Sequence, residues 1–184
     1  MPQGSFASAI NPTDSRVRQA LFVLGVTALT ALGARCQVDI QPVPFTLQTF
    51  AVYTGSLLLG RKLAPLSQGL YLACGAAGLG VFAGAAAGPS YFTGATGGYL
   101  LSYIPAGLLL GWLADRGWSE SFDKALAAMC LGAAVVFTLG VVWLSYFIGW
   151  HKALWSGCLL FLPSEAFKIV IGSLLVTGLR RQAK

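Results

Sequence analysis

From Leu63 to Ala114 the sequence contains no Asp, Glu, Lys or Arg. A tract of this length can cross a lipid bilayer twice, because one helical span takes about 20 apolar residues. The rest of the chain has the same character: 56% of its 184 residues are hydrophobic and only 10% are charged, whereas soluble domains carry about 25% charged residues. We therefore predict an integral membrane protein that forms a single membrane domain over residues 1–184.

The composition favours an all-α helical bundle. The chain has 23 glycines, and small residues let helices approach closely in lipid. The alternation of apolar and polar residues that a membrane β-barrel needs is absent. Breaks at prolines, glycines and charges predict six transmembrane helices, at about residues 17–34, 46–60, 64–84, 98–114, 125–149 and 164–179, after a flexible cytoplasmic tail at residues 1–15.

The basic residues predict the orientation. With a cytoplasmic N-terminus, nine basic residues lie inside, namely Arg16, Arg18, Arg61, Lys62, Arg116, Lys124, Arg180, Arg181 and Lys184, and three lie outside, namely Arg35, Lys152 and Lys168. Short loops rich in Lys and Arg stay on the cytoplasmic side, so both termini are predicted to be cytoplasmic. The net charge of +6 then reflects membrane orientation and does not indicate a nucleic-acid partner.

Three segments expected on the outer side do not fit a simple membrane helix. They are a Pro-rich stretch after the first helix, a Gly-rich turn after the third, and "ALWSGCLLFLP" before the sixth, which is too short to cross. Irregular backbone at membrane depth persists only where protein buries it or where it lines a wet cavity. We predict re-entrant or capping outer loops around a pocket that opens outward.

The segment "LPSEAFK" carries Glu165 and Lys168 one helical turn apart, on one face. Ser164 is a candidate N-cap for the helix that starts here. The charged pair is either an ion pair at the membrane surface or a donor and acceptor set that faces the bundle interior. Ionisable residues in membrane segments are candidates for function.

A glycine-rich motif, "TGATGGYL", precedes the fourth helix and contains Thr96, Gly97, Gly98 and Tyr99. Glycine permits close approach of a ligand to the backbone, and Thr96 is positioned to cap the helix. A tight turn between two packed helices accounts for the same glycines. The motif is therefore a candidate binding loop or a structural turn.

Polar residues also mark "QPVPFTLQTF", where Phe45 and Thr46 follow two prolines. The threonines and glutamines of this stretch either contact a ligand or bond between helices. Arg35 and Asp39 just before it are a pocket charge pair or ordinary surface charges. The sequence leaves both alternatives open.

The sequence predicts neither a metal site nor an enzyme. His151 is the only histidine, and the carboxylates are too scattered to form an oxygen cage. An intramembrane hydrolase that uses Thr96 as nucleophile is an alternative, but it lacks a general base within reach. The chain has no ATP-binding motif, so active transport would need energy from a partner.

Taken together and in this order, "VPFTLQTFAV", "TGATGGYL" and "LPSEAFK" resemble the BioY family, the biotin-binding S components of energy-coupling factor (ECF) transporters. The resemblance implies a six-helix bundle in the bacterial inner or plasma membrane that captures biotin from outside. It also implies a transmembrane (T) subunit and ATPase subunits as partners. Ala95 stands where the family has proline, and Ser164 and Glu165 stand where it has glycine and aspartate.

The resemblance also implies residue roles. Glu165 and Lys168 would match the N–H and carbonyl groups of the ureido ring, with biotin as transported ligand and no other cofactor. The apolar parts of biotin would pack on Phe45, Tyr91, Phe92, Tyr99 or Trp155, and Arg35 would hold its carboxylate. The nearest match to the partner-binding motif on the first helix is Thr27 with Ala31 and Thr30 with Ala34, although packing inside the chain explains these residues equally well. The alternatives are an S component for another vitamin and the intramembrane hydrolase.

Overall fold

The computed structural model describes residues 15–39 and 42–182. The predicted tail lies outside these residues except for Ser15, which is the first residue of a helix. The helices are α2 (Ser15–Arg35), α3 (Gln48–Ala76), α4 (Gly97–Asp115), α5 (Phe122–Ile148), α6 (Trp150–Gly157) and α7 (Leu162–Gln182). Short elements join them: strands β1 (Gln37–Val38) and β2 (Phe45–Thr46), and the 3-10 helices η2 (Ala83–Ala85), η3 (Pro89–Thr93) and η4 (Leu159–Phe161).

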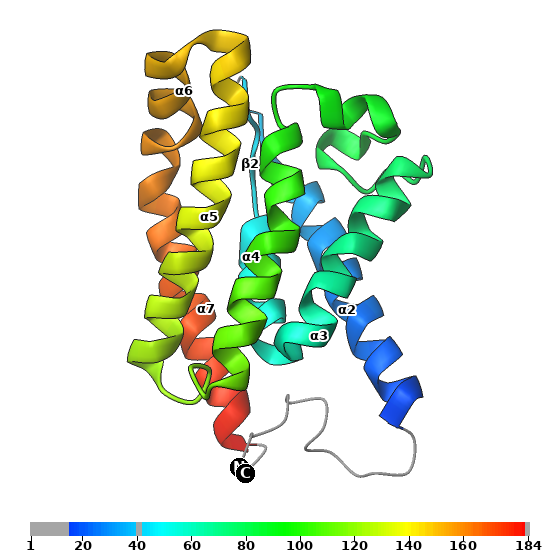
Figure 1. The fold of residues 1–184 in the computed structure, drawn as a ribbon, viewed down its shortest axis with the longest axis vertical. Coiled ribbons are helices and arrows are strands. Elements are labelled where there is room, and N and C mark those ends of the chain that lie inside the picture. The colour runs from blue at the N-terminus through cyan, green and yellow to red at the C-terminus, as the bar shows by residue number, and fades with distance from the viewer. Residues whose placement is uncertain (1–14, 40–41, 183–184) are drawn as a thin grey trace.

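The predicted all-α membrane class is confirmed by long apolar helices. Within the described residues, four helical segments are long and apolar enough to cross a membrane: Arg16–Arg35, Gly97–Asp115, Phe122–Ile148 and Trp150–Gln182. The last of these runs from α6 through η4 into α7. Figure 1 shows the helices side by side along one axis, with α2 starting and α7 ending at the lower end.

Helix α3 reverses direction at Gly60, where φ is 78° and ψ is 174°. A positive φ is unfavourable for residues with a Cβ atom, so glycine permits the reversal. Figure 1 shows the cyan first half of α3 running down and the teal second half running back up. The expected helices 46–60 and 64–84 therefore correspond to the two halves of α3. Helix α4 packs closely on the reversal, since a Cβ at Gly111 would lie 2.5 Å from the Gly60 carbonyl carbon.

Several predicted helix ends differ from the structure: α5 starts at Phe122 and not at residue 125, α7 ends at Gln182 and not at residue 179, and two ends in α3 are displaced by local structure. The second helix starts at Gln48 and not at residue 46, because Phe45 and Thr46 pair antiparallel with β1. The third ends at Ala76 and not at residue 84. Gly78, two residues after Ala76, has a φ of 97°. The Phe82 ring folds back into the space beside Gly75, so that a Cβ built on Gly75 would lie 2.0 Å from the ring.

The start of α7 also differs from the prediction. It begins at Leu162, so Ser164 lies inside the first turn and is not the N-cap. The Ser164 hydroxyl instead donates to the Phe161 carbonyl oxygen at 2.7 Å. The preceding segment, expected to be re-entrant, is helical: α6 packs against α5 and continues through η4 into α7.

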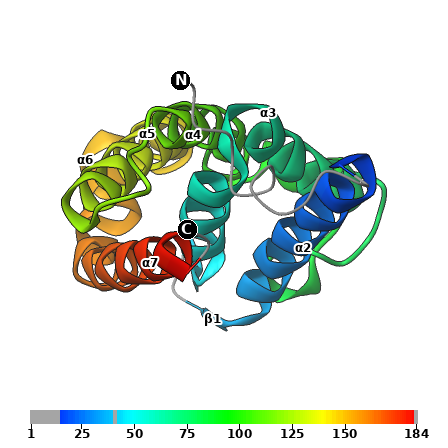
Figure 2. The same cartoon turned by 90° about the horizontal axis from the view of Figure 1, so that it is seen from below.

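The first half of α3 forms the centre of the bundle. Every residue from Ala51 to Leu57 is buried, and α3 contacts α2, α4 and α7. Figure 2 shows this half, in cyan, between α7, α4 and α2. Its N-terminal end lies in the upper half of Figure 1, near the strands, and this end carries the polar residues that form the site described below.

Candidate ligand-binding site

A cavity lies where the irregular segments meet the helix ends. It contains about 570 Å³ of space not filled by atoms, with open solvent at its mouth included, and its lining combines apolar side chains with a few polar groups, as in small-molecule sites. Residues from β2, η2, η3 and every helix except α2 line it: Val43, Pro44, Thr46, Gln48, Thr49, Ala83, Tyr91, Thr96, Tyr99, Leu100, Tyr103, Val136, Phe137, Gly157, Phe161, Glu165 and Lys168. The three segments singled out in the sequence all contribute to one cavity.

Glu165 and Lys168 form a buried ion pair in the cavity wall. Lys168 Nζ lies 2.7 Å from Glu165 Oε2, and only 6% and 3% of the Lys168 and Glu165 side chains are exposed. Lys168 Nζ also donates to the Thr46 carbonyl oxygen at 3.1 Å and to Thr49 Oγ1 at 2.9 Å. Burial of a charged pair is tolerated when hydrogen bonds satisfy its groups, and these three acceptors satisfy the ammonium group. The pair therefore faces the protein interior and not the membrane surface.

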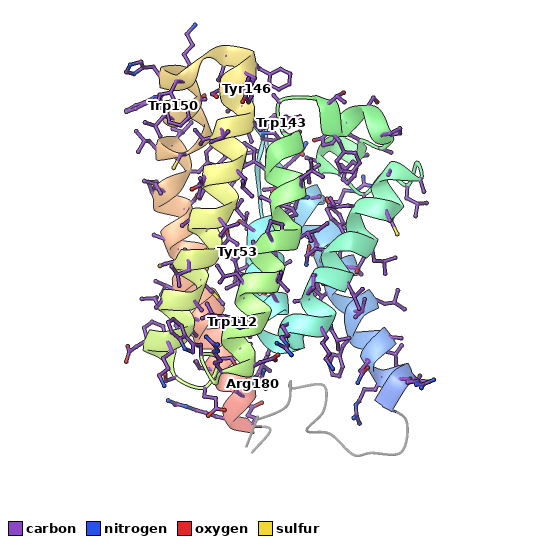
Figure 3. All side chains as sticks on the ribbon, in the orientation of Figure 1. Tyr53, Trp112, Trp143, Tyr146, Trp150 and Arg180 are labelled. Carbon is purple, nitrogen blue, oxygen red and sulfur yellow. The ribbon has the colours of Figure 1, made fainter. Side chains whose placement is uncertain are left out.

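The two oxygens of the Glu165 carboxylate differ. Oε2 accepts from Lys168 and from the Thr49 hydroxyl, at 2.7 and 3.2 Å. Oε1 is buried and has no hydrogen-bond partner within the described residues. The Tyr53 side chain lies near this carboxylate, midway along the bundle in Figure 3. An unsatisfied buried acceptor costs about 1–3 kcal/mol. The Tyr53 hydroxyl, which is also buried without a partner among the described residues, and a ligand N–H are the two donors that can satisfy Oε1.

Aromatic contacts hold the walls of the cavity. The Phe45 ring stacks on Phe161 at a centroid distance of 5.9 Å, and Lys168 Nζ lies 4.7 Å from the Phe45 centroid. Phe45 is not itself among the lining residues. The Phe45 ring makes a cation–π contact with the Lys168 ammonium group.

The loop that carries Ala83 and Tyr91 is anchored to α3. Gln48 Nε2 donates to the Tyr71 hydroxyl, which donates to the Val81 carbonyl oxygen at 3.1 Å. Next along the chain, the buried Phe82 ring stacks on Tyr91 at a centroid distance of 5.0 Å. Tyr91 is thereby held against the cavity, and its contact with a ligand stays a prediction. Phe92 packs edge-on against Phe82 and does not line the cavity.

In the glycine-rich motif, Thr96 and Tyr99 line the cavity, whereas Gly97 and Gly98 pack inside the protein. A Cβ at Gly97 would lie 1.9 Å from the Phe92 carbonyl oxygen, and one at Gly98 would lie 2.2 Å from Trp143 Cβ. Thr96 occupies the N-cap position, but its side chain makes no capping hydrogen bond, contrary to the prediction. Close packing explains the two glycines.

Two helices hold this motif in place. Trp143, near the upper end of the bundle in Figure 3, donates from Nε1 to the Gly94 carbonyl oxygen at 2.9 Å. The Tyr99 hydroxyl donates to the Gly157 carbonyl oxygen at 2.7 Å. These contacts connect α4 and its preceding loop to α5 and α6.

Besides Phe45, Phe92, Gly97 and Gly98, two more residues predicted for the site lie outside the cavity lining. Arg35, at the end of α2, donates from Nη2 to the Gly80 carbonyl oxygen at 2.6 Å, and the contact is exposed. Trp155 on α6 is 66% exposed. Asp39, the other half of the proposed charge pair, accepts from Gln37 Nε2 at 2.9 Å. The assignment of a ligand carboxylate to Arg35 is therefore corrected.

The residues predicted to meet a partner subunit also need correction. Thr27, Thr30 and Ala34 are buried, and Ala31 is half-buried against the core. The Thr27 hydroxyl donates to the Ser67 carbonyl oxygen of α3 at 2.9 Å. This face of α2 packs inside the chain, so the intramolecular alternative is the correct one.

Several lining residues were not among the predicted site residues. Gln48 and Thr49 belong to the polar stretch around Thr46, for which the sequence left ligand contact and bonding between helices open, and both line the cavity. Tyr103, Val136 and Phe137 belong to long apolar helices in which cavity-facing and lipid-facing residues look alike.

As for metals, no group of three His, Cys, Asp or Glu side chains that could hold an ion occurs in the part of the chain described by the structure.

Known proteins resemble this chain along most of its length. A biotin transporter BioY from Thermotoga maritima is 35% identical over 84% of this chain and 91% of the relative. A probable biotin transporter BioY from Pyrococcus horikoshii is 36% identical over 88% of this chain and 93% of the relative. A crystal structure described as the S-component for biotin from an ECF-type ABC transporter superposes with a TM-score of 0.83, at 26% identity, over 93% of this chain and 95% of that one. The sequence model of the BioY family matches residues 7–184, and the chain belongs to the BioY family.

Proposed function

We propose that this protein binds biotin and serves as the S component of an ECF-type transporter that imports it. The observation that carries the proposal is the buried Glu165–Lys168 pair in the cavity wall, with Glu165 Oε1 unpartnered among the described residues. The names of the relatives and the matched S-component support the same ligand.

The ureido ring of biotin presents N–H donors and a carbonyl acceptor. Glu165 Oε1 accepts an N–H, which satisfies its missing hydrogen bond. Lys168 reaches the carbonyl by exchanging one of its present acceptors for the ligand. The sulfur-containing ring and the valeryl chain pack on apolar and aromatic lining residues such as Leu100, Tyr103 and Phe137.

The carboxylate of biotin points toward the opening of the cavity in this proposal. An outer cavity adjoins the first and shares four lining residues with it, Pro44, Ala83, Tyr91 and Thr96. The Thr96 hydroxyl, which makes no capping bond, is free to donate to the carboxylate. This assignment replaces Arg35.

We propose six membrane crossings, with the two halves of α3 as separate spans. Eight of the nine basic residues predicted to lie inside belong to the start of α2, the α3 reversal, the α4–α5 connection with the first turn of α5, or the end of α7. All four regions lie at the lower end in Figure 1. Because short basic segments stay in the cytoplasm, this end is cytoplasmic, and both termini with it.

The proposed partners are a T subunit and ATPase subunits. The ATPase subunits supply the energy for transport, because the sequence of this chain shows no ATP-binding motif. The exposed face of α2, formed by Val17, Ala20, Leu21, Leu24, Gly25, Ala28, Leu29 and Leu32, is our proposed contact with the T subunit. Within the described residues, nothing lies within 4 Å of a Cβ built on Gly25, so a partner helix can approach it closely.

The experiment is a binding assay on the detergent-purified chain with labelled biotin and unlabelled vitamins as competitors. We expect sub-micromolar binding that unlabelled biotin displaces and that riboflavin, thiamine and folate do not. A Glu165→Gln variant that folds normally should bind at least tenfold more weakly, because it loses a charged acceptor. Absence of binding by the wild-type chain, or equal competition by another vitamin, would contradict the proposal.

A further inference from the structure

We propose that Thr49 is a positioning residue that fixes the Glu165 carboxylate for ligand recognition, an inference that rests on the proposed biotin-binding function. Thr49 lies in the first turn of α3, and Glu165 lies in the first turn of α7. The two residues are 116 positions apart in the sequence. Their hydrogen bond joins two elements that meet at the cavity.

The Thr49 hydroxyl has one proton, and its surroundings determine where that proton points. Lys168 Nζ donates to Thr49 Oγ1 at 2.9 Å, so the hydroxyl acts as an acceptor on that side. Its own proton is then available to Glu165 Oε2, which lies 3.2 Å away. The ammonium group, having no acceptor capacity, cannot compete for that proton.

The arrangement closes a ring of three side chains. Lys168 binds both Glu165 Oε2 and Thr49 Oγ1, and Thr49 binds Glu165 Oε2. Because Glu165 Oε2 accepts from two donors, rotation of the carboxylate about the Cγ–Cδ bond is restrained. Glu165 Oε1 is thereby kept as the oxygen without a partner among the described residues. The β-branched Thr49 side chain, restricted in χ1, adds to this order.

Thr49→Val keeps the shape of the side chain but removes the hydroxyl. Lys168 and Glu165 remain paired, yet Oε2 loses one donor and the carboxylate gains rotational freedom. The ligand must then order a carboxylate that the wild-type protein holds in place before binding. We expect biotin affinity to fall about tenfold, the effect of one hydrogen bond to a charged group.

The experiment is a double-mutant cycle on the full chain in detergent, with the Kd for biotin measured for wild type, Thr49→Val, Glu165→Gln and the double variant. If Thr49 acts through Glu165, Thr49→Val weakens binding about tenfold in the wild-type background and less than about twofold in the Glu165→Gln background. Thr49→Ser, which retains the hydroxyl, should remain within about threefold of wild type.

Thr54→Val is the matched control. Thr54 lies on the same half of α3, is buried, and donates only to carbonyl oxygens of its own helix, at Phe50 and Ala51. It should leave the Kd for biotin unchanged in both backgrounds.

Each outcome is decisive. Equal losses from Thr49→Val in both backgrounds would show that Thr49 acts through the ligand, through Lys168, which donates to it, or through packing, and not through Glu165, and would overturn the inference. Unchanged binding by Thr49→Val would overturn it too. Failure of the wild-type chain to bind biotin would instead overturn the proposed function.

Discussion

Lys168 donates to acceptors on three elements: Thr46 on β2, Thr49 on α3 and Glu165 on α7. Replacement by methionine keeps most of the side-chain volume but leaves Glu165 as a buried carboxylate without its cation. Loss of one partner of a buried ion pair typically costs about 3–5 kcal/mol. We predict that Lys168→Met lowers the thermal unfolding midpoint in detergent and abolishes biotin binding.

The double variant Glu165→Gln/Lys168→Met separates these two effects. It removes both charges, so thermal stability should return most of the way to wild type while binding stays lost. If the double variant is as unstable as Lys168→Met, an unpaired carboxylate is not the cause of the instability.

Single residues were predictable from the sequence where their chemistry is rare in a membrane protein. Glu165 and Lys168 stand out because charges in apolar segments require partners, and the structure brings both to the cavity. Arg35 has the same chemistry and was misplaced, because its position depends on the path of a loop that brings the Gly80 carbonyl to it. Residues such as Phe137 carry no local signal at all.

At the scale of secondary-structure elements, the reversal of α3 depends on Gly60. A Cβ at a φ of 78° is strained, and such residues cost of order 1–3 kcal/mol. We predict that Gly60→Ala lowers the unfolding midpoint of the purified protein.

Gly69→Ala is its control, since Gly69 lies in the same helix, has no positive φ, and nothing lies within 4 Å of its Cβ position. This variant should be neutral or slightly stabilising, because alanine favours helix more than glycine does. Equal destabilisation by the two variants would mean that the reversal does not need a positive φ.

Helices were predictable from hydropathy, but some of their ends were not. The end of α4 at Asp115 follows from the charge that closes an apolar segment, whereas α5 starts at Phe122, before Asp123 and Lys124 and three residues before the predicted start. The end of α3 at Ala76 depends on the notch at Gly75 that accepts Phe82, and the β1–β2 pairing depends on two strands of two residues each. Such features arise from contacts between particular residues seven to nine positions apart, which the mean hydropathy of a segment does not encode.

For the whole molecule, the proposed orientation predicts which cysteines an impermeant reagent reaches. Cys36 is exposed and follows α2 at the upper end, whereas Lys124 is exposed near the start of α5 at the lower end. In a variant that keeps Cys36 and has serine at Cys74, Cys130 and Cys158, an impermeant maleimide should label intact cells.

The comparison is a variant with serine at all four cysteine positions and the substitution Lys124→Cys. It should be labelled only after the membrane is permeabilised. The opposite pattern would invert the proposed topology and place the cavity on the cytoplasmic side.

The reversal at Gly60 has a consequence for biosynthesis. Each half of α3, Gln48–Leu59 and Arg61–Ala76, is shorter than the roughly 20 residues that an independent span requires. We expect the translocon to insert the two halves of α3 together, as a helical hairpin that enters the lipid once Ala76 has left the ribosome. A chain truncated inside the second half should then fail to integrate its first half as well.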